Sequence, residues 1–331
     1  MWLIQLLERY LGRTASHRNT PVRRPRWRPT VVRLEDRTVP SSFTATTVQD
    51  LVADINAANL TPEADTITLV AGKTFTISAA DNTTHGPTGL PLIAATESLT
   101  IIGNGDVVER SSAAGTPGFR LFDVAAGASL TLQNLTLQNG LALQYALFVP
   151  AEGGAVYNQG ELTLDAVTVQ GNSARGFDGP QDRLTFGFPG GDAAGGGIYS
   201  SGVLTMQGCL IQKNMAIGGK GSPGAVGSSA EGSYTAPGEA GGNGFGGGVY
   251  VSAGTVTVHA TTVTANTAKG GSGGAGFKGA SHGPDGEGVG GGFYIDITAT
   301  AGLDLFTVDH VKKNHASTSD DDIHGPYVVI P

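Results

Sequence analysis

The chain has 331 residues, of which 52 are Gly and only 15% are charged. Glycine is far above average usage but does not recur strictly at every third position, which excludes a collagen-like protein. The single cysteine, Cys209, excludes an intrachain disulfide, and the net charge of −8 argues against nucleic acid as the main partner.

Residues 1–40 differ in composition from the rest of the chain. They hold nine Arg and three acidic residues, a balance of about +6, which leaves about −14 for the remainder. The Arg- and Pro-rich segment 21–29 cannot pack a core and is predicted to be disordered. A basic tail that binds anionic surfaces is one interpretation. No stretch of the chain reaches the roughly 18 apolar residues of a transmembrane helix.

The end of this basic segment carries a short motif. Residues 32–40 read Val-Arg-Leu-Glu-Asp-Arg-Thr-Val-Pro. This resembles the Leu-Glu-x-Arg leader near the N-terminus of many large planctomycete surface and exported proteins. The resemblance implies export to the cell envelope or the extracellular space. The preceding apolar run is interrupted by Glu8 and Arg9, so it is not a standard secretory signal.

Residues 41–97 are predicted to be a capping region at the start of a folded body, 41–331. A strand is predicted over 43–46, and further strands over 64–69 and 73–77. Between them, helical spacing relates Val48, Leu51, Val52, Ile55 and Ala58. Thr46 or Thr47 is the expected N-cap. A helix here would cover strand edges that otherwise invite end-to-end aggregation.

Residues 98–318 contain an internal repeat. Each copy reads Gly-Gly-x-aliphatic-Tyr, then two short apolar strands, then Asn, and copies start at 153, 195, 246 and 290. Matched positions form apolar columns two residues apart, which is strand alternation: Leu162, Leu204, Val256 and Leu164, Met206, Val258. A three-residue step to the next column, Val167, Cys209 and Thr261, predicts a bend. Stacked units of this kind predict a parallel β-solenoid.

This order of features resembles the right-handed parallel β-helix proteins of the pectin-lyase-like superfamily. It is most similar to their bacterial surface branch with polymorphic-outer-membrane-protein-type repeats. Residues 64–69, residues 97–103 and the Gly-Gly-x-aliphatic-Tyr units carry the resemblance, which covers about 43–331. It implies an all-β fold, a single right-handed parallel β-helix with an N-terminal capping helix.

Three insertions follow the repeated Asn, over 173–194, 215–245 and 267–289. All leave at the same corner of the coil, so they are predicted to lie side by side on one flank. They are rich in Gly, Ser, Ala and Pro, and loops of this length are usually functional or disordered. Loose or disordered packing and a ligand-binding flank are both open interpretations.

Three sets of polar residues are candidate sites. The first is predicted to be a structural corner ladder: Asn172, Asn214, Asn266 and Asn314. The second is an outward column that could bind an ordered surface such as a glycan chain, although Thr is also simply a good strand former: Thr131, Thr163, Thr205 and Thr257.

The third set lies in the predicted C-terminal cap, 319–331: Asp320, Asp321, Asp322 and His324. Carboxylate oxygens suit Ca²⁺, but the spacing matches no EF-hand or zinc motif. A solvated capping turn is the alternative interpretation.

Polysaccharide lyases and hydrolases share the fold that the resemblance implies. A hydrolase needs clustered carboxylates, but the coil acids are scattered, and Asp165 aligns with Gln207 and His259. We therefore predict no catalytic residues and favour an exported, monomeric, non-catalytic surface, adhesion or matrix module. Its Gly-rich loops would bind polysaccharide or cell-surface components. The alternatives are a carbohydrate-active enzyme (polysaccharide lyase or hydrolase) and a Ca²⁺-stabilised structural scaffold.

Overall fold

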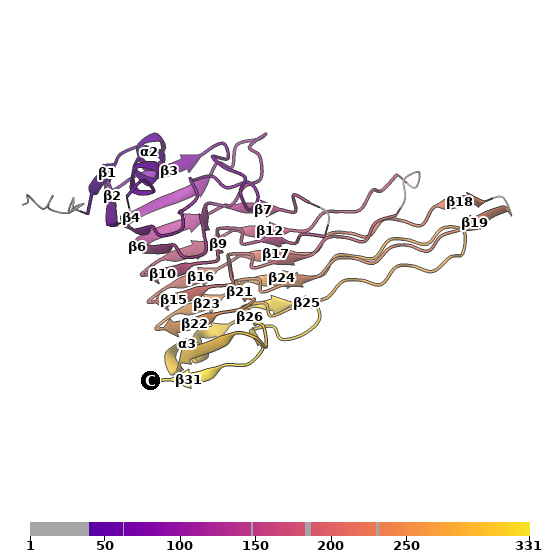
Figure 1. Ribbon diagram of the computed structural model, residues 1–331. Helices are drawn as coiled ribbons and strands as arrows, with labels where there is room; N and C mark the ends of the chain where they lie inside the picture. Colours follow the sequence, from indigo (N-terminus) through magenta and orange to yellow (C-terminus); the bar gives the residue numbers. More distant parts are fainter. Residues whose placement is uncertain (1–39, 62, 147, 183–186, 230–231) are drawn as a thin grey trace, which may run out of the picture. The chain divides into compact units, whose positions relative to one another are not determined.

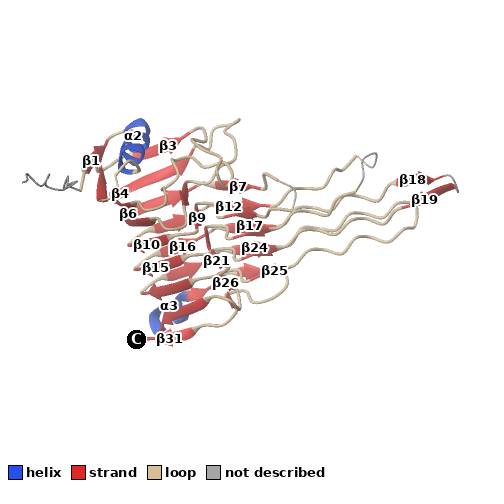
Figure 2. Ribbon diagram, in the orientation of Figure 1, coloured by secondary structure: helices blue, strands red, loops and turns tan. Residues whose placement is uncertain are grey.

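Parallel strands, stacked rung upon rung, make up most of the regular structure (Figures 1 and 2). The computed structural model describes residues 40–331 except 62, 147, 183–186 and 230–231, with no side-chain description over 226–235. These residues belong to one unit, Thr38–Pro331. The predicted leader over 1–40 therefore lies, apart from Pro40, outside the described residues.

The predicted N-terminal capping helix is confirmed. Helix α2 (Val48–Ala58) begins after Thr47, whose Oγ1 accepts from Asp50 N at 3.1 Å, while Asp50 Oδ2 accepts from Thr47 N at 3.0 Å. This reciprocal capping box satisfies two backbone donors that the helix leaves free. The helix buries Leu51, Ile55 and Ala58 against the first strands.

The largest sheet runs the length of the coils and contains all three strands predicted before the repeat. Its members are β1 (Ser42–Ala45), β2 (Ala64–Leu69), β3 (Thr74–Ile77), β4 (Ser98–Arg110), β6 (Ser129–Gln138), β10 (Glu161–Asp165), β11 (Thr168–Gln170), β15 (Val203–Gln207), β16 (Leu210–Gln212), β22 (Thr255–His259), β23 (Thr262–Thr264), β27 (Thr300–Asp304), β28 (Val311–Lys312) and β31 (Val328–Ile330).

Three smaller parallel sheets complete each coil. The first contains β7 (Leu141–Leu143), β12 (Ser173–Arg175), β17 (Met215–Ile217), β24 (Thr267–Lys269) and β29 (His315–Ala316). The second contains β8 (Ala151–Glu152), β13 (Ala193–Ala194), β20 (Gly244–Phe245) and β25 (Gly288–Val289). The third contains β5 (Phe122–Val124), β9 (Val156–Asn158), β14 (Ile198–Ser200), β21 (Val249–Val251), β26 (Phe293–Ile295) and β30 (Ile323–His324).

Equivalent residues of successive coils pair in register. Leu162 pairs with Leu204, which in turn pairs with Val256. Each of these side chains is buried, and the neighbouring columns follow the same register. An all-β parallel β-helix with an apolar interior of aligned columns is therefore confirmed.

Backbone conformation explains the first glycine of the Gly-Gly-x-aliphatic-Tyr segment. At Gly195 the backbone has φ of 66°, in the left-handed region, and a Cβ there would lie 2.3 Å from Ile198 O. Only glycine fits such a position without strain. The repeated glycine therefore marks the tight corner that precedes each Tyr-bearing strand.

The four Asn residues form a continuous buried column. Asn172 Nδ2 donates to Asn214 Oδ1 at 3.0 Å, and Asn214 Nδ2 donates to Asn266 Oδ1 at 3.0 Å. Asn266 Nδ2 donates to Asn314 Oδ1 at 2.9 Å, and Asn314 Nδ2 donates to Asp322 Oδ1 at 2.9 Å. The second proton of each Nδ2 goes to a backbone carbonyl of the preceding coil. The column thus satisfies the polar groups at a corner closed to water.

One feature of the last coil was not expected from the repeat. Where other coils have a short bend, the chain forms helix α3 (Leu305–His310), and Asp304 Oδ1 accepts from Thr307 N at 2.8 Å as its N-cap. The C-terminal coil is followed by β30 and β31, which pair with β26 and β27.

Replacing one member of the Asn column should lower the free energy of unfolding more than replacing a surface residue of the same coil. We expect Asn214→Ala to destabilise by about 2–3 kcal/mol, because it leaves buried donors and acceptors of its neighbours unsatisfied. Gln212→Ala removes only a half-buried side-chain bond to Gln170 and should cost less than about 1 kcal/mol. Thermal denaturation followed by circular dichroism compares them, and equal losses would contradict the argument.

Glu97 should make stability depend on pH. Burial, followed by the nearby Asp65, raises the pKa of the Glu97 carboxyl to about 7, and neither of its oxygens has a hydrogen-bond partner among the described residues. The contribution of Glu97 to stability is full below the usual pKa and is lost as the pH rises through about 7. We therefore expect Glu97→Gln to raise Tm by about 2–4 °C at pH 8 and to have little effect at pH 4. An increment that is the same at both pH values would refute this.

Candidate functional site

The three Gly-rich insertions form one projecting arm, defined as residues 176–192, 218–243 and 270–287 without the undescribed positions. Each insertion leaves the coils after β12, β17 or β24 and returns at β13, β20 or β25. Because those rungs pair in register, the insertions lie side by side (Figure 1). The predicted arrangement of the loops on one flank is confirmed. An antiparallel hairpin, β18 (Val226–Ser229) and β19 (Gly232–Thr235), lies toward the tip.

Backbone hydrogen bonds between extended segments hold the arm together. Gly219 N donates to Gly191 O at 2.8 Å, and Gly242 N donates to Gly219 O at 2.9 Å. Gly271 N donates to Gly242 O, and Gly286 N to Gly271 O, both at 2.8 Å. These bonds connect all three insertions in one continuous series.

An equivalent series of hydrogen bonds lies three residues closer to the tip of the arm on every segment. Ser222 N donates to Phe188 O at 3.0 Å, and Glu239 N donates to Ser222 O at 2.9 Å. Gly274 N then donates to Glu239 O at 2.7 Å, and Gly283 N to Gly274 O at 2.9 Å. Three residues is the period of polyproline II, an extended helix without internal hydrogen bonds, whose backbone groups are free to pair with neighbours.

Close approach of the segments explains the glycines. A Cβ on Gly219 would lie 1.8 Å from Phe177 O, and one on Gly271 would lie 1.8 Å from Gly219 O. A Cβ on Gly286 would lie 1.9 Å from Gly242 O. No side chain fits at such distances, as at the axis of collagen. In its described part, therefore, the arm is packed through its backbone and is not a set of loose loops.

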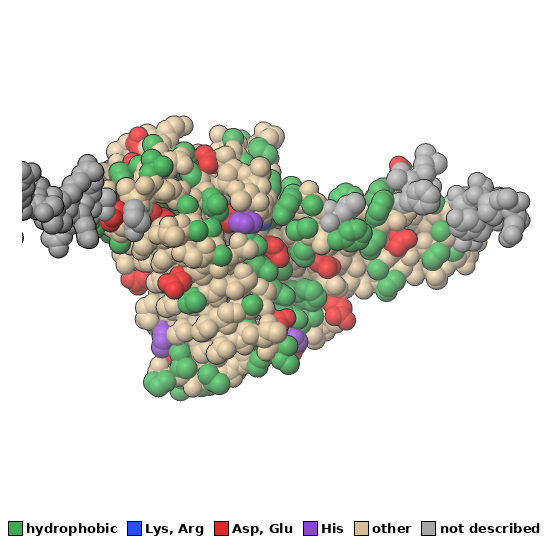
Figure 3. Space-filling model, in the orientation of Figure 1, with side chains coloured by type: hydrophobic (Ala, Val, Ile, Leu, Met, Phe, Trp, Pro, Cys, Tyr) green, Lys and Arg blue, Asp and Glu red, His purple; other side chains and the backbone are tan. Residues whose placement is uncertain are grey.

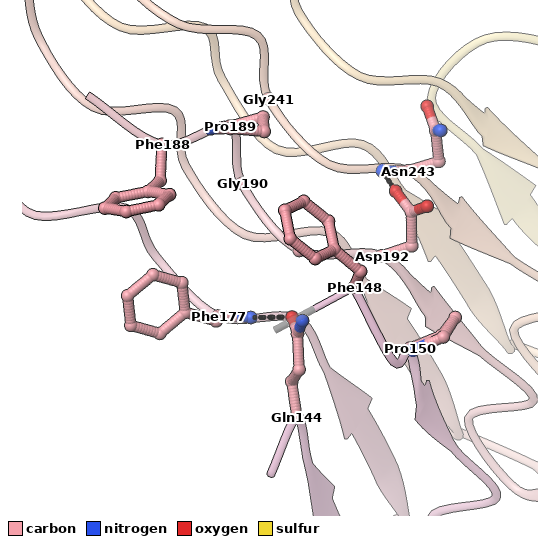
Figure 4. Close-up of a pocket in the computed structure, with 11 residues that line it drawn as sticks. Gln144, Phe148, Pro150, Phe177, Phe188, Pro189, Gly190, Asp192, Gly241 and Asn243 are labelled. Carbon is pink, nitrogen blue, oxygen red and sulfur yellow. Dashed lines mark hydrogen bonds between the residues drawn. The ribbon is translucent and has the colours of Figure 1, made fainter. Parts of the chain in front are cut away.

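A pocket lies on the side of the arm formed by the first insertion (Figure 4). Its volume is about 270 Å³, and Figure 4 shows three phenylalanine rings bordering the same hollow: Phe148, Phe177 and Phe188. The remaining lining comprises Gln144, Pro150, Pro189, Gly190, Gly191, Asp192, Gly241 and Asn243. Phe148 is 84% exposed and Phe177 is 40% exposed, so two of these rings face solvent.

The pocket exists because the coil before the first insertion has only a short connection. Residues 144–150 join β7 to β8, where later coils carry the long insertions. The first insertion therefore has another insertion, the second, on one side only. On its other side lies the short connection 144–150. Phe177 N donates to Gln144 Oε1 at 3.0 Å, which joins the two. Figure 3 shows hydrophobic side chains gathered where the arm meets the coils.

The polar side chains of the pocket are mostly engaged. Gln144 Nε2 donates to Ala146 O at 2.9 Å, in addition to the bond from Phe177. Asn243 N donates to Asp192 Oδ1 at 2.6 Å, and Asn243 Oδ1 accepts from Glu287 N at 2.8 Å. Asp192 is the one charged side chain among the described lining residues. The site thus offers aromatic surface and a negative charge, with few free hydrogen-bonding groups.

A separate polar cluster lies beneath the excursion at 81–89. His85 Nδ1 is 3.0 Å from Asp123 Oδ2, and Asp123 is fully buried. Arg120 donates through Nη1 to His85 O at 2.8 Å, and its guanidinium carbon lies 4.8 Å from the centroid of the Tyr157 ring. Burial raises the pKa of both Asp123 and Glu152, whereas Arg120 opposes both rises.

Next to this cluster, tyrosine rings stack along the coils. The ring centroids of Tyr157 and Tyr199 are 5.2 Å apart, those of Tyr199 and Tyr250 are 5.5 Å apart, and those of Tyr250 and Tyr294 are 4.8 Å apart. Burial raises the pKa of Tyr157 and of Tyr199 to about 12. These phenols stay protonated at neutral pH, so the column acts as packed aromatic surface.

The Thr column predicted from sequence lies in register on the largest sheet. Thr131 pairs with Thr163, which pairs with Thr205, which pairs with Thr257. Two earlier rungs, Thr100 and Thr66, continue the row. The side chains are half-buried on the outer face, about 4.8 Å apart between rungs. A binding role for this face stays a prediction.

The acidic C-terminal residues bond to the last coil and within their own turn. Asp322 Oδ1 accepts from Asn314 Nδ2 at 2.9 Å, and Asp321 Oδ1 accepts from Ala316 N at 2.7 Å. Asp320 Oδ2 lies 2.6 Å from His324 Nδ1. Across the described residues, no group of three or more His, Cys, Asp and Glu side chains is placed to hold a metal ion.

Sequence analysis did not identify the pocket or the polar cluster. The signal for the pocket was present, because Phe177 and Phe188 stand in an insertion otherwise dominated by small and polar residues. The glycines at 218, 221 and 224 likewise show a local period of three. No sequence spacing relates His85 to Asp123 or Arg120, which only the fold brings together.

Adding one methyl group inside the arm should loosen it locally. We expect Gly242→Ala to destabilise the arm by about 1–3 kcal/mol, because its Cβ would lie 2.0 Å from Gly191 O. Lys220→Ala, at an exposed position of the same arm, is the matched control. Hydrogen exchange should show faster exchange at Gly219 and Gly271 amides in the glycine variant alone. Unchanged protection in Gly242→Ala would show that the arm does not depend on close packing.

In the part of the chain that the structure describes, no helix is long and apolar enough to cross a membrane. Comparisons with protein-family models, with curated proteins and with solved structures found no match to this chain. The fold is therefore assigned from the chain's own strand pairing, as a parallel β-helix of stacked repeats that carries a backbone-bonded, Gly-rich arm.

Proposed function

We propose that the protein is an exported, non-catalytic surface, adhesion or matrix module that binds cell-surface components through its arm. The observation that carries the proposal is the solvent-facing aromatic pocket on a projection held by its own backbone hydrogen bonds. Export and the finer relation to right-handed pectin-lyase-like proteins with polymorphic-outer-membrane-protein-type repeats are part of this proposal, and both rest on sequence resemblance.

The rigidity of the arm supports a binding role. Segments already fixed by hydrogen bonds lose little conformational entropy when a ligand binds, and such preorganisation raises affinity. Phe148 adds a second argument, because it has φ of 64° and yet is 84% exposed. A bulky residue in the left-handed region is strained, and strain that burial does not offset is typical of functional positions.

The half-exposed Thr row offers the module a second surface. It presents a regular hydroxyl array on the largest sheet, at the spacing of the rungs. We propose ordered polysaccharide as the partner of this face.

A carbohydrate-active enzyme is the second candidate, and the His85–Asp123 pair favours it. A buried carboxylate that orients an imidazole is a recurring arrangement for a general base. Arg120 lies close by, and its buried positive charge stabilises the ionised Asp123 carboxylate. Tyr157 adds a phenol whose ring centroid is 5.4 Å from that of His85.

One experiment separates these candidates. The full chain is tested for binding to acidic and neutral polysaccharides and to bacterial cell envelopes, and the same mixtures are assayed for reducing ends and unsaturated products with and without Ca²⁺. We expect binding without turnover, and at least about a tenfold weaker affinity when Phe148→Ser and Phe177→Ser are combined. Val328→Ser, at an exposed apolar residue of the C-terminal coil, should have no effect.

If the full chain shows turnover that disappears in His85→Ala, the protein is an enzyme and the surface-module proposal is wrong. Neither binding nor turnover on any member of the panel would remove both candidates. Binding that survives the double Phe variant would move the binding site from the pocket to another surface, with the Thr row tested next by Thr163→Glu and Thr205→Glu.

A further inference from the structure

The pocket on the first insertion has a composition that restricts its ligand. Aromatic rings border it, and Asp192 is the one charged side chain among its described lining residues. The polar side chains of Gln144 and Asn243 already bond to the protein. A ligand with many hydroxyl groups would find few free partners there, and an anion would face the Asp192 carboxylate.

We infer that this pocket binds a quaternary ammonium group, such as the trimethylammonium head of choline. This inference rests on the proposed role of the arm as the binding surface. A quaternary ammonium ion donates no hydrogen bonds, carries a diffuse positive charge and is attracted to the faces of aromatic rings. A quaternary ammonium group therefore needs aromatic surface and one compensating carboxylate, and the pocket supplies both.

The geometry of the rings agrees with this chemistry. In Figure 4, Phe148, Phe177 and Phe188 lie apart around a shared hollow instead of stacking on one another. This differs from the tyrosine column, where Tyr157 and Tyr199 stack with centroids 5.2 Å apart. Rings that border a cavity leave their surfaces available to a ligand, and the volume of about 270 Å³ leaves room for a small cation with its tether.

The charge of the protein also favours a cation. The chain carries a net charge of −8 although residues 1–40 are basic, so the folded part is strongly acidic. The charged side chains visible on the arm in Figure 3 are acidic. A field of this sign raises the local concentration of cations and their association rate.

The test is calorimetric titration of the full chain with choline and with 3,3-dimethylbutan-1-ol, a carbon isostere of the same shape without the charge. We expect choline to bind at least about tenfold more tightly than the isostere. Asp192→Asn keeps an oxygen for Asn243 N but removes the charge, and should weaken choline binding about tenfold. Phe177→Leu keeps an apolar side chain but removes the ring, and should weaken choline binding several-fold.

Asp178→Asn is the matched control, since Asp178 lies in the same arm and accepts from Lys220 N but does not line the pocket. It should leave choline binding unchanged. Equal affinity for choline and the isostere would overturn the inference, because it would show a merely apolar pocket. Saturable binding of a neutral disaccharide without choline binding would also overturn it.

Two further binding measurements identify the source of the quaternary ammonium group. Binding to phosphatidylcholine vesicles, but not to phosphatidylglycerol vesicles, would assign a lipid headgroup. Choline binding without vesicle binding would assign a soluble or polymer-linked methylated amine. Failure here is distinct from failure of the proposed function: envelope binding that choline does not compete would leave the surface module standing and refute the cation site.

Discussion

The spacing between parallel strands is the constraint on which the rest of the structure depends. Successive coils stack at about 4.8 Å so that each strand can bond to its equivalent in the next coil. Insertions leaving at the same corner inherit a similarly close spacing, as the register of β12, β17 and β24 requires. In the arm, unlike the coils, a segment has close backbone neighbours on more than one side: Gly219 N bonds to Gly191 O, and a Cβ on Gly219 would meet Phe177 O. Glycine at the contact positions, such as Gly219 and Gly271, follows from these additional backbone contacts.

The same constraint explains where the stack leaves unpaired edges. In a stacked array the backbone of each rung is covered by the next rung, so unpaired edges are left only at its ends. The coils end at α2 on one side and at β31 on the other. One end of the arm is the first insertion, because residues 144–150 are too short to add another layer. The aromatic pocket lies at this end of the arm.

Buried polar groups follow two different arrangements. The Asn column repeats with the coils, so each member bonds to the next and to the backbone, and the last one bonds to Asp322. The cluster around His85, Asp123 and Arg120 occurs once and joins an irregular excursion to the first coils. In a repeating polar row, the hydrogen bonds of each member are supplied by the equivalent residue of the next coil. Such a row is therefore structural. A unique cluster of charged groups has no such explanation from the repeat.

The sequence by itself determined the coil. Apolar alternation, the three-residue step at the bend and the recurrent Asn predicted the strands, their columns and the flank of the insertions, because each of these is a local pattern that stacking repeats. Helix α2 was likewise readable from its spacing and from Thr47. Only the tertiary structure decided that the glycines pair across insertions, that Phe148 and Phe177 meet at one pocket, and that His85 reaches Asp123. Those contacts join segments far apart in the chain, and no periodicity relates them.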